Sequence, residues 1–403
     1  MQVYMVGGAV RDKLLKRAYT DKDFVVVGAT PEQMLQAGFI QVGDDFPVFL
    51  HPKTKEEYAL ARTERKSGKG YKGFEVYASP EVTIEEDLLR RDLTINAMAI
   101  EVKGLMDDTP ITGEVVDPYN GQQDIKDKVL RHVSEAFSED PLRVLRIARF
   151  YGRFYDPKLE QDKNEHNFIV APETIALIGQ INDSDELKHL TAERVWQETS
   201  RALLQNSPQA YIDCLMKVGS LPHVMPNLAE ALSNNSTKDL VFNALQIAAQ
   251  QNFNLAQRWA ILMLAFTTEP MDQLESSTNL EGCQSWLAEA KALAQLLKVP
   301  KKIAQFAQAY ITCYPYLTHY AQLTAEDIAK LITITKADKS ELELSELLQV
   351  HKVVELSCQQ LQFSKYIQAF KAITINDVDE GLRGSAIGEA IHQARVEAIA
   401  KLK

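Results

Sequence analysis

Two glycines and two aspartates near the start of the chain constrain its fold more than any other feature. The apolar residues 3–6 lead into Gly7 and Gly8, and the apolar residues 24–27 follow Asp21 and Asp23. This order predicts a strand, a tight turn, a helix and a second strand. Residues two apart on a strand point to one face, so Asp21 and Asp23 can reach a common metal site.

Either half of this pattern has an ordinary explanation when it stands alone. A Gly-Gly pair after a strand is usually only a tight turn, and Asp-x-Asp is common at exposed strand starts. Together and in this order, Gly7 and Gly8 leave room for a bulky group such as a triphosphate, and the aspartates add carboxylates for a cation. The combination favours metal-assisted chemistry on a nucleotide.

Composition is typical of a globular protein with several domains. The chain has 403 residues, of which 45% are hydrophobic and 25% charged, and this length predicts two to four domains. Its start lacks the pattern of a signal peptide, and its longest apolar run, residues 259–266, is too short to span a bilayer. Four widely spaced cysteines are typical of reduced thiols. We therefore expect a cytoplasmic protein without a membrane segment.

Charge is distributed unevenly along the chain. The net charge of −11 argues against general nucleic-acid binding, but residues 62–72 are rich in arginine and lysine. Arg143, Arg146, Arg149 and Arg153 recur at three- and four-residue steps and share one helical face. That face can bind phosphates if it lines a cleft, or it can simply be solvated.

The pattern changes character along the chain. Residues 3–6, 24–27, 47–50 and 58–61 read as strands, and residues 11–17 and 31–36 as helices, the second with Thr30 as its N-cap. From about residue 132 onward, apolar residues recur every three or four positions, which predicts an all-α remainder. We expect a helix to begin at residues 138–143 and another at Thr191.

A Gly- and Lys-rich segment, residues 64–80, is predicted to be a mobile loop. It contains a G-x-G-x-x-G match at residues 68–73, but no apolar strand precedes the match and no periodic helix follows it. We therefore reject a dinucleotide-binding interpretation. A role near phosphates and a plain surface loop both remain open.

Several polar residues add candidate chemistry to the N-terminal region. Glu57 at the start of a predicted strand is a candidate third carboxylate for a two-metal site. Arg91 suits a phosphate oxygen through its planar fork, and Asp92 could accept hydrogen bonds from ribose hydroxyls. The alternative is a helix terminus with paired surface charges.

Asp140 and Arg143 lie three residues apart at the start of a predicted helix. One is an acceptor and the other a multiple donor, so together they could read the Watson–Crick edge of C or A. The alternative is an ion pair at the helix end, worth a few tenths of a kcal/mol.

These motifs, taken together, resemble bacterial class II tRNA nucleotidyltransferases, the CCA-adding enzymes, and most closely the γ-proteobacterial type. The resemblance covers roughly residues 1–200 and, more loosely, residues 384–391. It is carried by Gly7-Gly8-x-x-Arg11-Asp12 with Asp21-x-Asp23, and by segments 57–66, 90–97, 117–121, 131–133, 139–146 and 193–196.

The resemblance implies a polymerase-β-like α/β head followed by an all-α neck, body and tail. We place the head at residues 1–137, the neck with a nucleotide-templating helix at 138–222, and the body and tail at 223–403. It implies template-independent addition of C, C and A to the 3′ end of tRNA from CTP and ATP, with release of pyrophosphate. The body and tail would hold the acceptor and T arms of tRNA.

The resemblance also implies roles for individual residues. Asp21 and Asp23 would be the magnesium ligands, and Asp92 would lie near the ribose. Asp140 and Arg143 would select the base, and residues 64–80 would help to switch from C to A. The implied nucleotide-binding residues are Gly8, Arg11, Arg91, Arg143 and Arg146.

One departure from the family concerns residues 223–403. Longer γ-proteobacterial relatives carry an HD phosphohydrolase domain after the neck, whereas this sequence has no His-Asp doublet. We therefore predict no phosphatase or phosphodiesterase activity. Residues 101–116 also look expanded, and no role is assigned to them.

Three alternatives stay open at this point. A poly(A) polymerase shares the same kind of head, and a partial enzyme could add only CC or only A. The third alternative is a non-catalytic tRNA-binding protein. The sequence identifies no stable protein partner.

Overall fold

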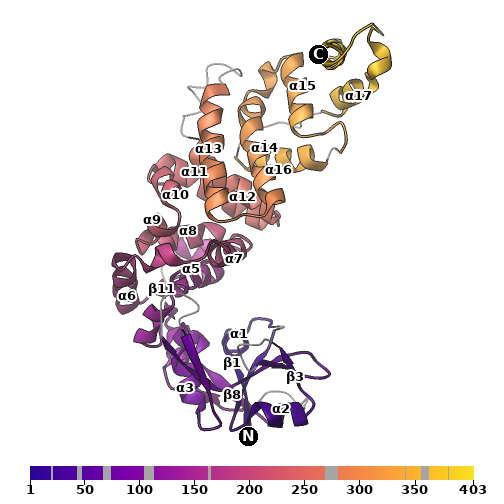
Figure 1. The fold of residues 1–403 in the computed structure, drawn as a ribbon. Coiled ribbons are helices and arrows are strands. Elements are labelled where there is room, and N and C mark those ends of the chain that lie inside the picture. The colour runs from indigo at the N-terminus through magenta and orange to yellow at the C-terminus, as the bar shows by residue number, and fades with distance from the viewer. Residues whose placement is uncertain are drawn as a thin grey trace. The chain divides into compact units, whose positions relative to one another are not determined.

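The computed structural model describes residues 1–19, 21–42, 48–66, 74–103, 113–161, 165–267, 280–340, 342–354, 363–379 and 381–403 (Figure 1). The chain forms two compact units. The first comprises Met1–Arg194 and Asp213–Val224, and the second Val195–Ile212 and Met225–Lys403. The boundaries predicted at residues 137 and 222 stay predictions.

A mixed sheet forms the centre of the first unit's N-terminal part. Within the described residues it has seven strands in the order β3-β4-β5-β2-β1-β8-β9. Strand β1 pairs antiparallel with β2 and β8, and β2 pairs parallel with β5. The bounds are β1 Gln2–Val6, β2 Asp23–Val27, β3 Ile40–Val42, β4 Val48–Leu50, β5 Glu57–Leu60, β8 Ala99–Val102 and β9 Val115–Val116.

Both faces of the central strands are buried. Met5, Phe24 and Val26 belong to one hydrophobic cluster, and the alternate residues Tyr4 and Val25 belong to a second. Alternation of side chains across a strand puts these two sets on opposite faces. This double burial explains why residues 3–6 and 24–27 are apolar throughout.

The helices of the N-terminal part begin where local chemistry allows. Helix α2 spans Pro31–Gln36, and Thr30 caps it in a capping box with Gln33, as predicted. Helix α1 spans Gly8–Leu14, so the predicted range 11–17 starts too late and ends too late. The turn at Gly7 leads directly into the helix, and Lys16 with φ 53 lies just beyond its end.

The predicted loop over residues 64–80 is wrong at both of its ends. Strands β6, Arg62–Lys66, and β7, Phe74–Ala78, pair antiparallel. The aromatic and β-branched residues of 74–78 favour a strand, which the glycine and lysine content concealed. Residues 67–73, which hold the whole G-x-G-x-x-G match, and residues 104–112 of the predicted expansion lie outside the described residues.

The rest of the first unit is mainly helical. Its helical elements include α3 Ile84–Leu89, η1 Thr94–Asn96, α4 Gly121–Lys126, η2 Glu135–Glu139, α5 Leu142–Phe154, α6 Pro172–Asp183 and α9 Leu221–Val224. A 3₁₀ turn thus precedes α5, where one helix start was predicted. A short strand, β11 Ile169–Val170, pairs with β10 Val129–Leu130 and is an exception to the predicted all-α region. Helix α7, Ala192–Leu203, begins directly after Thr191.

The second unit is helical in all the parts that the structure describes, as the periodicity predicts. Helix α12 is buried from Gln257 to its end at Met263 and contacts α11, α14 and α16. Among these described residues, no helix combines the length and apolarity that crossing a membrane requires. The helix bounds are α10 Pro226–Ala231, α11 Asn235–Gln250, α12 Leu255–Met263, α13 Leu280–Leu296, α14 Lys301–Thr318, α15 Ala325–Ile334, α16 Leu342–Val354, α17 Ser364–Ala372 and α18 Ser385–Ala400.

Candidate active site

The turn between β1 and α1 brings two arginines to two glycines. Gly7 has φ 67 and ψ −127, a conformation that residues with a side chain rarely adopt. A Cβ atom on Gly7 would lie 3.0 Å from Nη1 of Arg91, and one on Gly8 would lie 3.5 Å from Nη2 of Arg11. The guanidinium groups therefore lie against the backbone of the turn. The predicted roles of Gly8, Arg11 and Arg91 in nucleotide binding stay predictions.

The carboxylates gather at one end of the neighbouring strands. Asp23 is the first residue of β2, and its register partners are Val6 of β1 and Glu57 of β5. Because directly paired residues project to the same face of a sheet, Asp23 and Glu57 leave the sheet side by side. Asp21 lies two residues earlier, and all three residues are exposed.

The charges of this group act on one another. Partial desolvation raises the pKa of Asp23 above its ordinary value, Arg91 opposes the rise, and the negative charge of Asp21 adds to it. Asp21 and Asp23 are thus close enough to repel, and Arg91 is close enough to compensate. A divalent cation would relieve this repulsion in the same way.

The donor set of Asp21 and Asp23 fits a magnesium ion that shares its coordination with a substrate. Carboxylate oxygens are preferred Mg²⁺ ligands, and Mg²⁺ is commonly held by one or two carboxylates plus phosphates. Among the residues that the structure describes, no three Asp, Glu, His or Cys side chains converge into a complete metal site. Glu57 therefore neighbours Asp23 without completing such a group, and its catalytic role stays a prediction.

Asp87 holds Arg91 in place, and sequence reasoning missed it. Its Oδ2 accepts a 3.0 Å bond from Nη2 of Arg91, and its Oδ1 accepts from Nε of Arg90 at 3.3 Å. Burial acts to raise the pKa of Asp87, but the two arginines hold it below its ordinary value. Nε of Arg91 has no hydrogen-bond partner among the described residues. Asp87 precedes Arg91 by four residues, a spacing that could have revealed the pair.

Asp92 is engaged by protein groups. It is 6% exposed; its Oδ2 accepts from Nε of Arg146 at 2.7 Å, and its Oδ1 accepts from Nδ2 of Asn96 at 3.0 Å. Burial acts to raise its pKa, but Arg146 and Asn96 hold that pKa well below the ordinary range. The predicted contact with a ribose stays a prediction, and Arg146 reaches the site through Asp92.

The predicted base-reading residues lie at the start of α5, Asp140 just before the helix and Arg143 in its first turn, and each has its own partners. Nη1 of Arg143 donates to the carbonyl of Ala136 at 2.8 Å, and its Nη2 donates to the carbonyl of Arg90 at 2.6 Å. Oδ2 of Asp140 accepts from Nη2 of Arg194 at 2.8 Å. No local signal identifies Arg194, because it lies 54 residues from Asp140.

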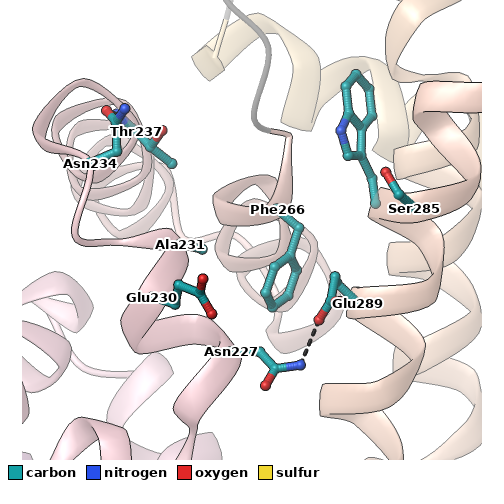
Figure 2. A pocket seen from close by; sticks show the side chains of 9 residues that line it. Asn227, Glu230, Ala231, Asn234, Thr237, Phe266, Ser285 and Glu289 are labelled. Carbon is teal, nitrogen blue, oxygen red and sulfur yellow. Dashed lines mark hydrogen bonds between the residues drawn. The ribbon is translucent and has the colours of Figure 1, made fainter.

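A separate pocket of about 550 Å³ lies in the second unit (Figure 2). Carboxylates, amides and hydroxyls surround the ring of Phe266, and Nδ2 of Asn227 donates to Oε2 of Glu289 at 2.6 Å. No histidine, lysine or arginine is among its lining residues, which are Asn227, Glu230, Ala231, Asn234, Thr237, Phe266, Ser285, Trp286 and Glu289. The predicted lack of hydrolase activity in residues 223–403 stays a prediction.

Fold and site together define a nucleotidyltransferase of the class that carries a polymerase-type head. Residues 3–131 match the Poly A polymerase head domain, and residues 167–232 match the probable RNA and SrmB-binding site of polymerase A.

Within this class the chain belongs to the CCA protein family. It is 39% identical to the Multifunctional CCA protein of Acinetobacter baumannii, over 100% of this chain and 98% of that protein. It is 41% identical to the Multifunctional CCA protein of Alcanivorax borkumensis, with the same coverage. The chain covers nearly the whole length of both relatives.

Solved structures confirm the predicted fold class. A CCA-adding enzyme in apo form II has a TM-score of 0.64 and 21% identity, covering 100% of this chain and 91% of that chain. The Thermotoga maritima CCA-adding enzyme complexed with tRNA-CCA has a TM-score of 0.60 and 21% identity, with coverage of 100% and 92%.

Proposed function

We propose that this protein adds C, C and A to the 3′ end of tRNA from CTP and ATP without a nucleic-acid template, releasing pyrophosphate. Its full-length relatives are named CCA proteins, and proteins of the same fold include CCA-adding enzymes in complex with CTP, ATP and tRNA-CCA. The observation that carries the proposal is the placement of Asp23 beside Glu57 at the end of paired strands. Asp21 and Arg91 are close enough to Asp23 to shift the pKa of its carboxyl in opposite directions.

Asp21 and Asp23 would hold magnesium in a two-metal arrangement, which polarises the tRNA 3′-hydroxyl and offsets charge on the pyrophosphate leaving group. The protein's own residues position the triphosphate. Gly7 and Gly8 place no side chain in the turn, and Arg91 is fixed there by Asp87. A guanidinium held in this way offsets phosphate charge without reorganising during the reaction.

Base choice is assigned to Asp140 and Arg143. Asp140 accepts from the exocyclic amine of C or A, and Arg143 donates to a ring nitrogen or carbonyl. The bases of G and U would leave buried polar groups unpaired, which is costly. Both side chains would exchange their present partners, Arg194 and two main-chain carbonyls, for the base.

Gly8, Arg11 and Arg146 complete the proposed nucleotide site. Gly8 and Arg11 are adjacent at the turn, and Arg146 is joined to Asp92. The charges of Arg11 and Arg146 would offset those of the phosphates. Asp92 would meet the ribose only after releasing one of its present hydrogen-bond donors.

The test uses tRNA that lacks its last three nucleotides, with magnesium and CTP, ATP or both. We expect the tRNA to be extended by two nucleotides with CTP alone and by three nucleotides with CTP and ATP together. Extension by CC only or by A only would identify a partial enzyme, and no extension would refute the proposal.

A second candidate follows from the match to the Poly A polymerase head domain. A poly(A) polymerase would add long runs of A to many RNA 3′ ends and would not use CTP. Incubating the protein with ATP and an unrelated RNA separates this activity from CCA addition.

A further inference from the structure

We propose that Asn96 is a positioning residue for the nucleotide: it fixes Arg11 and Asp92 together, and thereby ties the base-reading helix α5 to the Gly7–Gly8 turn. This inference rests on the proposed function, because its readout is nucleotide use. Asn96 ends the short 3₁₀ helix η1 and is 6% exposed.

The amide of Asn96 joins a cation on one side to an anion on the other. Its Oδ1 accepts a 2.5 Å bond from Nη1 of Arg11, and its Nδ2 donates a 3.0 Å bond to Oδ1 of Asp92. Only this orientation of the amide pairs a donor with each acceptor, because the flipped amide would turn its NH₂ toward the guanidinium. An amide is therefore the group that these two neighbours require.

Two arginines of α5 complete the network from outside. Nε of Arg146 donates to Asp92 at 2.7 Å, and Nη2 of Arg153 donates to Oδ2 of Asp12 at 2.8 Å. Asp12 in turn accepts from Nε of Arg11 at 2.9 Å. Arg146 and Arg153 are seven residues apart, about two helical turns, so they contact the network from one face of α5.

An aromatic pair packs against the same part of the network. The rings of Phe150 and Phe154 on α5 are stacked with 6.2 Å between their centroids. The guanidinium of Arg11 lies 5.1 Å from the first centroid and 5.4 Å from the second. Arg11 is thus enclosed by α5 and bonded to Asn96, so the position of α5 sets the position of Arg11.

Three arginines of the network, Arg11, Arg146 and Arg153, bond to two carboxylates, Asp12 and Asp92. One of these arginines, Arg11, lies beside the turn at Gly8. Its positive charge complements an anionic triphosphate. Without the amide of Asn96, Arg11 and Asp92 lose their common partner, and the two ends of the nucleotide site can shift independently.

The test compares Asn96→Ala and Asn96→Asp with Thr94→Val as the matched control. Thr94 lies in the same 3₁₀ helix, is 2% exposed, and donates a 2.6 Å bond to Asp124, which is outside the network. We expect both Asn96 variants to raise KM for CTP and for ATP at least about tenfold, while the affinity for tRNA changes less than about twofold. Asn96→Asp faces Asp92 with a second negative charge, so it should be the more severe.

The inference is overturned if active protein keeps its KM in both Asn96 variants, or if Thr94→Val raises KM as much. A wild-type protein that does not extend tRNA would instead overturn the proposed function and this inference with it.

Discussion

Substitution of Gly7 by alanine should destabilise the first unit and displace Arg91. Gly7 has φ 67 and ψ −127, and a side chain in such a region costs about 1–3 kcal/mol of strain. The new methyl group would also lie 3.0 Å from Nη1 of Arg91, so the guanidinium must move by a few tenths of an ångström. That movement weakens its charged bond to the buried Asp87, a type of bond worth about 1.5–3 kcal/mol when lost completely. We expect a total of about 2–4 kcal/mol.

The matched control is Gly8→Ala, one residue further along the chain. Gly8 is the first residue of α1, and its Cβ would make an ordinary contact 3.5 Å from Arg11. Its effect on the free energy of unfolding should stay within about 1 kcal/mol. The same methyl group would occupy space proposed for the triphosphate, so Gly8→Ala should raise KM for CTP without loss of stability.

The assay is urea unfolding of both variants and wild type, followed by circular dichroism, together with KM for CTP. A value for Gly7→Ala within 1 kcal/mol of wild type would refute the reasoning about this turn. Equal destabilisation by Gly8→Ala would also refute it.

Three further predictions concern the body and the base-reading helix. Burial lowers the pKa of His351 to about 4 from 6.5, so the unfolded chain binds this proton first, and stability is lost as the pH falls from about 6.5 toward 4. The free energy of unfolding falls by about 2 kcal/mol at pH 5 because of this group. Between pH 7 and 5 the His351→Phe variant should therefore lose about 2 kcal/mol less stability than wild type, as measured by thermal unfolding. A variant with the same pH profile as wild type would contradict the assignment. Arg258 donates to the carbonyls of Leu203, Gln205 and Phe253, so Arg258→Met should destabilise the second unit by about 3–5 kcal/mol in urea unfolding, and a loss under 1 kcal/mol would count against this role. Asp140→Ala should relax the choice of CTP over UTP more than it slows CMP addition, and unchanged selectivity would exclude Asp140 from base choice.

Local patterns predicted the parts of the fold that local physics determines. The apolar runs at 3–6 and 24–27 become β1 and β2, and Thr30 caps α2, because side-chain alternation and capping depend on near neighbours. The same patterns missed the start of α1. The positive φ of Gly7 turns the chain straight into a helix, and no apolar periodicity marks that point.

The sequence names candidate residues for the site but not the contacts that join them. Strand order brought Asp23 beside Glu57, as two expected strands with acidic starts suggested. The partners of Arg11 and Asp140 could not be found in this way. Arg11 meets Asn96 across 85 residues, and Asp140 meets Arg194 across 54, so these contacts depend on tertiary packing.

The central claim is that Asp21 and Asp23 together support metal-dependent transfer to the tRNA 3′ end. The most direct measurement is CMP incorporation into tRNA lacking its terminal CCA, in magnesium, by Asp21→Asn, Asp23→Asn and the control Glu56→Gln. Glu56 is a neighbouring carboxylate that pairs with Lys22 at 3.2 Å and has no proposed part in the reaction. We predict that both aspartate variants lose incorporation while binding tRNA normally, and that Glu56→Gln stays active. Incorporation at the wild-type rate by either aspartate variant would contradict the claim.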